Sequence, residues 1–257
     1  MAIELHGDTT GSGPALLVLH GLFGSATNWR SMARSLSATY EVHALDLRNH
    51  GTSPWADSMS YREMADDVRN YIDRHELGQV AVMGHSMGGK TAMVLALEYP
   101  DLVERLIVVD IAPRSYADSL SSYAQAMRSV DVFSAASRGE IQRQLQAVLP
   151  DAAIAPFLVQ NLVTRNEHFD WRINLAAITA AMPDLTGFPT ELQTRVFPRP
   201  TTAIAGALSD YLPNGDGTPF APMFPKLEVE VIAGAAHWVH ADQPVKFAEA
   251  VQRALAR

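Results

Sequence analysis

The sequence contains no cysteine among its 257 residues. A disulfide framework and a thiolate metal site are therefore excluded, and the composition fits a reducing compartment. No run of about 18 apolar residues occurs, so the sequence offers no segment typical of a membrane-spanning helix. The first residues, MAIELHGDTTGSG, carry acids and glycines where a signal peptide needs a basic and then an apolar segment. We therefore expect a cytoplasmic protein with no membrane partner.

Positive charge is also scarce in this sequence. The formal net charge is −8 at pH 7, and no local cluster of Lys and Arg offsets it. Such a protein repels phosphate backbones, so nucleic-acid binding is not expected. With 47% hydrophobic and 19% charged residues, the composition is that of a globular protein. The length suits one main domain, and it leaves open a monomer or a small homo-oligomer.

Short aliphatic runs recur along the chain, and most are continuous rather than alternating. This pattern predicts strands that are covered on both faces, as in a parallel sheet. Between them lie segments of helical spacing, such as SYREMADDVRNYIDRHEL, where Tyr61, Met64, Val68 and Tyr71 share one stripe. The alternation predicts a doubly wound, mostly parallel α/β sheet. The runs that predict strands begin at Ala15 (ALLVLH), Glu41 (EVHALDL), Gln79 (QVAVMGH), Arg105 (RLIVVD), Thr201 (TTAIAGAL) and Leu227 (LEVEVIAG).

The alternation of strand and helix stops between about Ile111 and Pro198. This stretch contains segments of helical spacing, such as RGEIQRQLQAVL and NLAAITAAM, and no obvious core strand. It closes at VFPRP, where two prolines precede the return to strand character. We interpret residues 111–198 as an inserted helical cap between two parts of the core, residues 1–110 and 199–257.

The pentapeptide GHSMG lies between a predicted strand and a predicted helix. It matches the nucleophile elbow G-x-S-x-G, in which Gly84 and Gly88 permit a turn that pushes Ser86 into the cleft in a strained conformation. The Met87 amide, at the start of the following helix, can then stabilise an oxygen that turns negative during acyl transfer. Because a glycine-rich turn with an incidental serine would look the same, the pentapeptide needs support from the rest of the chain.

A serine nucleophile needs a base, and the base needs a carboxylate behind it. His237, in VIAGAAHWVHADQP, follows a predicted strand late in the chain, which fits the order Ser, acid, His of this architecture. His240 is interpreted as a packing or capping residue. A second oxyanion donor is expected in LVLHGLFGSATNW, where position favours the amide of Leu22, with Phe23 as the alternative.

The motifs HGLFGS, DLRNHGTSP, GHSMGGK, VVDIAP and AGAAHWVHADQP, in this order, resemble the α/β-hydrolase superfamily. More narrowly, they resemble its YbfF-like branch of small bacterial esterases. The motifs cover the whole core, whereas the cap matches chiefly at FDWRINL, around Trp171. The resemblance implies the α/β-hydrolase fold and hydrolysis of a small-molecule carboxylic ester through a serine acyl-enzyme, with no cofactor and no metal. Acyl-CoA thioesters are further candidate substrates.

The acid departs from the common pattern of the superfamily. The usual carboxylate follows the penultimate strand at a G-x-x-D position, where GALSDYL has Ser209, and Asp210 comes one residue late. Asp110, which closes RLIVVD, stands where the resembled branch carries its acid. We favour Asp110 and keep Asp210 as the alternative, because a shift of one residue in a loop can turn a side chain away from His237.

Substrate choice is expected to fall to the cap, with Phe23 beside the nucleophile. Trp171 is taken as a candidate wall of the substrate pocket. Arg48 and His50, in DLRNHG, either bind an acidic group such as a CoA phosphate or brace neighbouring loops. The other apolar cap residues that could line an acyl pocket, or simply pack the cap helices, are Met127, Phe133, Phe157 and Met182.

Three functions remain open from the sequence. The first is a serine carboxylesterase or thioesterase that acts on short to medium acyl chains. The second keeps the same triad and acts on a lactone, an amide or a carbon–carbon bond. The third is a non-catalytic receptor for a small molecule on the same fold. Dehalogenase and epoxide hydrolase chemistry are not favoured, because those relatives carry a carboxylate at the elbow, where this chain has Ser86.

Overall fold

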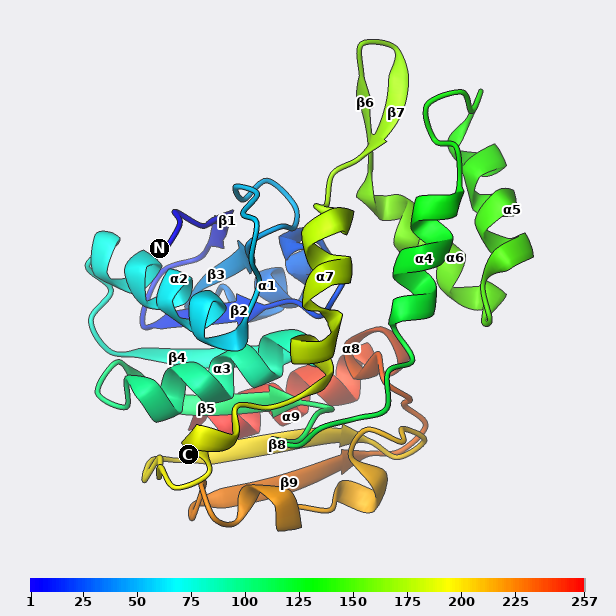
Figure 1. Ribbon diagram of the computed structural model, residues 1–257. Helices are drawn as coiled ribbons and strands as arrows, with labels where there is room; N and C mark the ends of the chain where they lie inside the picture. Colours follow the sequence, from blue (N-terminus) through cyan, green and yellow to red (C-terminus); the bar gives the residue numbers. More distant parts are fainter. Residues whose placement is uncertain (257) are drawn as a thin grey trace.

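The computed structural model of the chain describes residues 1–256, and its main element is a seven-stranded sheet (Figure 1). The strand order is β1-β3-β2-β4-β5-β8-β9. β1 runs antiparallel to β3, and the other neighbouring strands of this sheet are parallel. The strands span His6–Thr10 (β1), Ala15–Leu19 (β2), Glu41–Asp46 (β3), Val80–His85 (β4), Val103–Val109 (β5), Thr201–Gly206 (β8) and Leu227–Ile232 (β9).

All six strands that the aliphatic runs predict are present, as β2, β3, β4, β5, β8 and β9. The predicted mostly parallel α/β sheet is therefore confirmed. β1 is an additional strand that the pattern does not predict. Its sequence, HGDTT, contains no aliphatic residue, and the strand lies largely exposed at the edge of the sheet.

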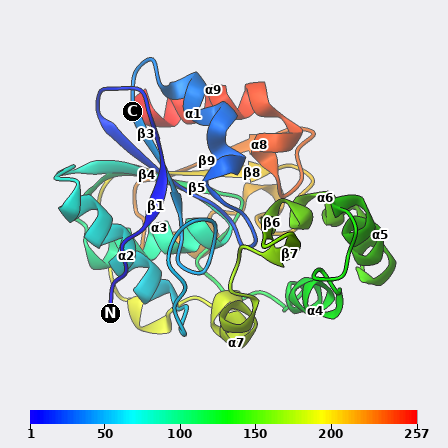
Figure 2. The ribbon, with the colours of Figure 1, turned by 90° about the horizontal axis from the view of Figure 1, so that it is seen from above.

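Helices cover both faces of the sheet (Figure 2). On one face lie α1 (Arg30–Leu36) and α9 (Pro244–Ala256), and on the other lie α2 (Tyr61–Arg74) and α3 (Met87–Glu98). The predicted stripe of α2 is confirmed, because all four of its members are buried against the core. α8 (Val239–Asp242) is a single turn that precedes α9.

The central strands supply apolar side chains to both helical layers. In β2, Leu16 and Val18 belong to the cluster formed with α1 and α9, whereas Leu17 and Leu19 belong to the cluster on the α2 and α3 side. Successive side chains of a strand point to opposite faces, so a strand that is covered twice is apolar at every position. This arrangement explains the continuous aliphatic runs.

Between β5 and β8 the chain leaves the sheet and forms a separate group of helices, at the upper right of Figure 1. The segment is largely helical, as expected, and in the described chain none of its strands joins the main sheet. The unexpected element is an antiparallel hairpin of β6 and β7. The bounds are Ser121–Ser129 (α4), Arg138–Val148 (α5), Ala155–Leu158 (α6), Leu162–Arg165 (β6), His168–Trp171 (β7) and Leu175–Thr186 (α7).

Short 3-10 turns complete the described structure. They span Ala26–Trp29 (η1), Ala152–Ile154 (η2), Val159–Asn161 (η3), Thr190–Leu192 (η4), Pro213–Gly215 (η5) and Thr218–Phe220 (η6). Among residues 1–256, the structure has no helix with the length and apolar character needed to cross a bilayer.

Candidate active site

Three polar residues meet at the carboxyl edge of the sheet. Ser86 follows β4, Asp110 follows β5, and His237 lies in the loop after β9. Nε2 of His237 lies 3.1 Å from Oγ of Ser86, and Nδ1 lies 2.7 Å from Oδ2 of Asp110. Because an ionised carboxylate only accepts hydrogen bonds, the neutral ring donates from Nδ1 and accepts the serine hydroxyl at Nε2. The three side chains therefore form one continuous hydrogen-bonded chain.

The turn that carries Ser86 is strained. Its backbone has φ 52° and ψ −117°, which non-glycine residues rarely adopt and which costs about 1 to 3 kcal/mol. A Cβ atom on Gly84 would lie 2.1 Å from the carbonyl oxygen of Gly88. A Cβ atom on Gly88 would lie 2.4 Å from the carbonyl oxygen of Leu19. β4, β2 and α3 approach so closely at this turn that only glycine, which has no Cβ atom, fits at these two positions.

The carboxylate of Asp110 is fully buried and held by two donors besides His237. The amide of Gly206 donates to Oδ1 at 3.0 Å, and the hydroxyl of Ser209 donates to Oδ2. Asp210 is exposed, and the structure does not bring it to the histidine. Ser209, at the G-x-x-D position, therefore hydrogen-bonds to the same Asp110 carboxylate as His237 does.

The ring of His237 is also fixed by Tyr211, in the loop after β8. The two rings stack with centroids 4.0 Å apart and an interplanar angle of 21°. The hydroxyl of Tyr116 donates to the backbone oxygen of Tyr211 at 2.8 Å, which ties this loop to the segment after β5. Sequence reasoning missed the contribution of Tyr211 and Ser209. The sequence did contain a signal for them, because GALSDYL follows a predicted strand and so lies at the carboxyl edge of the sheet, next to the other site residues.

Two further histidines support the loop of His237. Nε2 of His85 donates to the backbone oxygen of His237 at 2.8 Å. Burial, and then the neighbouring His237, lower the pKa of His85 well below its usual value, so this ring is neutral. His240 stacks on Trp29 at 4.4 Å, and burial lowers its pKa to about 4. The packing role expected for His240 is what the structure shows.

The amides proposed for an oxyanion hole differ in their partners. The Phe23 amide donates to Nε2 of His50 at 3.2 Å, so this donor is engaged. Burial lowers the pKa of His50 to about 3, and the neutral ring can accept at Nε2 while Nδ1 donates to the oxygen of Arg48. Within residues 1–256 the amides of Leu22 and Met87 have no protein partner. The amides of Leu22 and Met87 are therefore better candidates for the oxyanion donors than the amide of Phe23.

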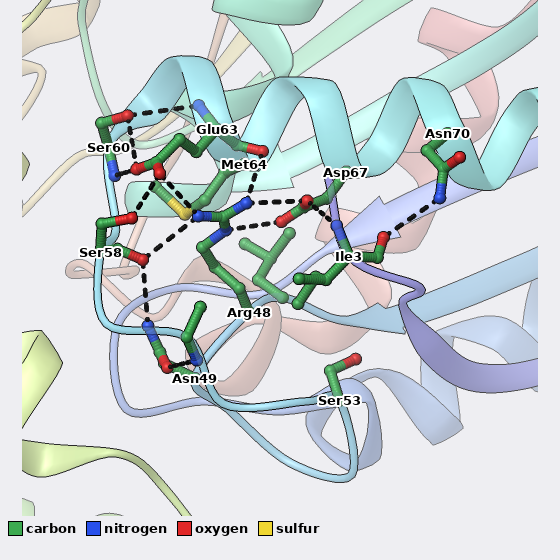
Figure 3. A network of polar contacts seen from close by, with 12 residues as sticks. Ile3, Arg48, Asn49, Ser53, Ser58, Ser60, Glu63, Met64, Asp67 and Asn70 are labelled. Atoms are coloured by element: carbon green, nitrogen blue, oxygen red, sulfur yellow. Dashed lines mark hydrogen bonds and ion pairs between the residues drawn. The ribbon is translucent and has the colours of Figure 1, made fainter. Parts of the chain in front are cut away.

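Arg48 lies beneath α2 rather than in a ligand site (Figure 3). Its guanidinium contacts Asp67 at 2.6 and 2.9 Å and Glu63 at 3.1 Å, and its side chain is buried. It also donates to the backbone oxygen of Ser58 at 3.2 Å. Together with the contact between His50 and Phe23, this favours the bracing interpretation of DLRNHG over phosphate binding.

Two hollows meet at Ser86. We call them the large cleft, of about 790 Å³, and the small cavity, of about 30 Å³. Phe23 and Phe157 line the large cleft, and Met182 lines the small cavity. Among the described residues, no group of three or more His, Asp or Glu side chains is arranged to hold a metal ion.

Trp171 lies outside the linings of both hollows, which corrects the expectation that it forms a pocket wall. Its side chain is buried, and its indole N–H donates to the backbone oxygen of Met127 at 3.1 Å. The tryptophan therefore fastens the hairpin to α4. Phe133 stacks on His168 at 3.8 Å and stays 61% exposed, so it does not line a pocket either.

Lys90, in the first turns of α3, is a buried cation that sequence reasoning missed. Its ammonium donates to the backbone oxygens of Thr186 at 3.0 Å and of Gly187, at the end of α7. Burial lowers the pKa of Lys90 to about 7, and the nearby Arg114 acts in the same direction. This side chain joins the core to the last turn of the inserted helix.

Comparison with known proteins shows the family to which the chain belongs. A family model described as alpha/beta hydrolase fold matches residues 14–244. The chain belongs to this family. The family and fold that the motifs indicate are therefore confirmed.

Among family members, the chain is 37% identical over 252 residues to "sn-1-specific diacylglycerol lipase ABHD11" of Danio rerio, covering 95% of this chain and 79% of that protein. It is 31% identical over 244 residues to "Esterase YbfF" of Escherichia coli (strain K12), covering 93% and 92%. The solved structure of a "Marine microorganism esterase" has a TM-score of 0.93 at 36% identity, covering 98% of this chain and 99% of that one. The similarity extends over the cap as well as the core.

Proposed function

We propose that the protein is a serine carboxylesterase, which cleaves carboxylic esters through an acyl-enzyme on Ser86. The observation that carries the proposal is the hydrogen-bonded chain from the Ser86 hydroxyl through His237 to Asp110. Relatives that are named esterases and a lipase support the same reaction class. A non-catalytic receptor has no need of a nucleophile held in a strained turn.

In the first step, the Ser86 oxygen attacks the ester carbonyl carbon while Nε2 of His237 takes the hydroxyl proton. The carbonyl π electrons move to the oxygen, which becomes an oxyanion. The amides of Leu22 and Met87 are the proposed donors to this oxyanion, and each such donor is worth about 3 to 4 kcal/mol in the transition state. The start of α3 adds a favourable dipole.

The intermediate then collapses, and the bond between the carbonyl carbon and the alcohol oxygen breaks. His237 returns its proton from Nε2 to the departing alcohol, which leaves an ester of Ser86. In the second half, water gives a proton to His237 and attacks the acyl carbon. His237 then returns this proton to the Ser86 oxygen as the intermediate collapses, which releases the carboxylic acid and restores the serine hydroxyl. The whole cycle uses side chains, backbone amides and water.

Asp110 orients His237 in this scheme and stabilises the imidazolium that forms in each half. The carboxylate accepts from Nδ1, from the Gly206 amide and from the Ser209 hydroxyl, so its orientation is fixed. These contacts support Asp110, and not Asp210, as the acid. The role is supported by this geometry and by the resemblance of VVDIAP to the YbfF-like branch.

Other acyl compounds share this chemistry. A lactone, an amide or a carbon–carbon bond next to a carbonyl would pass through the same intermediate, and the triad does not separate them. Acyl-CoA thioesters carry several phosphate charges on the leaving group. Asp151 and Asp242 line the large cleft, and among residues 1–256 no Lys or Arg does so. This charge pattern favours uncharged esters over CoA thioesters.

The proposal is tested by hydrolysis of p-nitrophenyl acetate and by labelling with a fluorophosphonate. The wild type should release p-nitrophenol and acquire one phosphonyl group on Ser86, located by peptide mass spectrometry. Ser86→Ala should lose the label and reduce kcat/KM by more than about 10³-fold, since loss of the nucleophile leaves only binding and oxyanion stabilisation. A variant that hydrolyses as fast as the wild type would rule out the mechanism.

A further inference from the structure

The two hollows that meet at Ser86 are very different in size. The small cavity measures about 30 Å³ and the large cleft about 790 Å³. The small cavity therefore leaves much less room for a bound group than the large cleft does. An ester bound at the serine has two arms, an acyl arm and an alcohol arm. The size difference therefore raises the question of which arm each hollow receives.

The position of His237 answers this question. His237 lines the large cleft and is absent from the lining of the small cavity, as these are described for residues 1–256. In the step that forms the acyl-enzyme, Nε2 of this histidine must protonate the departing alcohol oxygen. The alcohol arm must accordingly lie on the side of the large cleft. The acyl arm is left on the side of the small cavity.

We propose, resting on the function proposed above, that the small cavity selects a short acyl group, no longer than butyrate, and the large cleft holds a bulkier, uncharged alcohol. The chain is thus specific for short-chain esters of large alcohols rather than for long-chain acyl esters.

The walls of the small cavity are held in place. Met182 and Leu185 of α7 form one side, and both are buried. The hydroxyl of Tyr61 donates to the backbone oxygen of Leu185 at 2.6 Å, and the ammonium of Lys90 donates to that of Thr186 at 3.0 Å. These two bonds fix the end of α7 against the core. A longer acyl chain would have to displace this helix end or leave through the exposed loop segment 117–119.

The large cleft has the opposite character. Its lining includes the aromatic side chains of Tyr123, Phe157 and Trp238, and the rings of Phe157 and Trp238 lie 6.0 Å apart. The carboxylates that line it, Asp151 and Asp242, disfavour an anionic ligand. An apolar cleft of several hundred Å³ is typical of sites that bury most of a small organic molecule. It suits an uncharged aromatic or branched alcohol.

The experiment varies the two arms separately. In one series the alcohol is always p-nitrophenol and the acid runs from acetate through butyrate and hexanoate to octanoate. In the other series the acid is always acetate and the alcohol runs from methanol through benzyl alcohol to naphthylethanol. For the wild type, kcat/KM should fall by about 100-fold or more between butyrate and hexanoate, since hexanoate has two methylenes more and each methylene too many in a fitted pocket costs roughly 10- to 200-fold. With acetate, kcat/KM should rise with the size of the alcohol.

A matched pair of variants decides the assignment. Met182→Ala enlarges the small cavity and should raise the relative rate on hexanoate by about tenfold while leaving the order of the alcohols unchanged. Phe157→Ala enlarges only the large cleft and should change the order of the alcohols while leaving the acyl-length profile unchanged. If circular dichroism shows that Met182→Ala is unfolded, Leu185→Val replaces it, because this smaller change in the same wall also enlarges the small cavity.

The reverse result would overturn this inference. If Phe157→Ala alters the acyl-length profile and the small-cavity variants do not, the acyl arm lies in the large cleft, although the proposed function stands. A wild type that hydrolyses octanoate as fast as acetate also overturns it. Failure of the proposed function is a different observation, namely that no ester in either series is cleaved faster by the wild type than by Ser86→Ala.

Discussion

The carboxyl edge of the sheet and the inserted cap are positioned by different kinds of contact. At the edge, Ser86, Asp110 and His237 sit at strand ends and turns whose geometry is fixed by glycines, buried donors and the sheet itself. In the cap, side chains take their positions from contacts between helices and a hairpin that no local pattern marks. Local turn chemistry therefore encodes the proposed reaction, whereas long-range packing encodes the proposed specificity.

The largest expected effect separates the two candidate acids at the edge. Asp110→Asn should keep the fold and lower kcat by roughly 10⁴-fold, because an amide cannot hold His237 in the productive tautomer. Asp210→Asn is the matched control, since that side chain is exposed. Its kcat should stay within about twofold of the wild type. Steady-state rates on p-nitrophenyl acetate measure both. If Asp210→Asn is the damaging change, the assignment moves to Asp210.

A second prediction concerns the support beneath the edge. Arg48→Met leaves the buried carboxylate of Asp67 without its partner, and breaking a buried ion pair in this way costs about 3 to 5 kcal/mol. The free energy of unfolding in urea should fall by that amount. The ratio of rates on acetate and hexanoate should not change, because Arg48 lies under α2 and lines neither hollow. A changed ratio with intact stability would return Arg48 to the list of ligand contacts.

A third prediction tests Lys90, which joins the two regions. Burial lowers its pKa to about 7 from the usual 10.5. Below pH 7 the ammonium is charged in both folded and unfolded chains, and the full cost of burying it is present. Between pH 7 and about 10 the unfolded chain binds more protons than the folded one, so stability from this group rises with pH.

The measurement compares the wild type with Lys90→Met, in which the ammonium is absent. From pH 7.5 to 9.5, the free energy of unfolding of the wild type should rise relative to that of the variant by up to about 1.4 kcal/mol per pH unit. Urea unfolding at five pH values is sufficient. A difference between the two proteins that stays constant over this range would show that the ammonium is not destabilised by burial.

The smallest effect is expected for Trp171 in the cap. Trp171→Phe removes the indole donor to Met127 and some packing, so the free energy of unfolding should fall by about 1 kcal/mol. The acyl-length profile should be the same as in the wild type, since Trp171 lines neither hollow. A shifted profile would mean that the tryptophan acts on substrate choice after all, and that cap packing and specificity are less separable than the comparison suggests.

The sequence predicted the sheet because strands covered on both faces must be apolar throughout. β1 was beyond this reasoning, since an exposed edge strand such as HGDTT needs only backbone pairing with β3. The helical character of the cap was predictable from spacing, but the hairpin of β6 and β7 was not, because its LVTR and HFDW segments are too short to show a period.

Within the site, local motifs were enough to single out Ser86 and His237. The choice between two carboxylates stayed open, because it depends on donors about a hundred residues away in Ser209 and Gly206. Trp171 illustrates the same limit. The periodicity of apolar residues along a helix or strand does not show whether a large side chain contacts a ligand or the next helix.

The register of β4 and β5 has a consequence for how this protein can change. His85 pairs with Val109, so Ser86 and Asp110, one residue further along, stand opposite each other at the ends of two neighbouring parallel strands. The distance between them is set by the spacing of two neighbouring strands rather than by the length of a connecting loop. The loop between β8 and β9 supplies the hydroxyl of Ser209 and the ring of Tyr211. In the described chain no residue between Tyr211 and His237 lines either hollow, so a change of loop length there leaves the spacing of Ser86 and Asp110 intact.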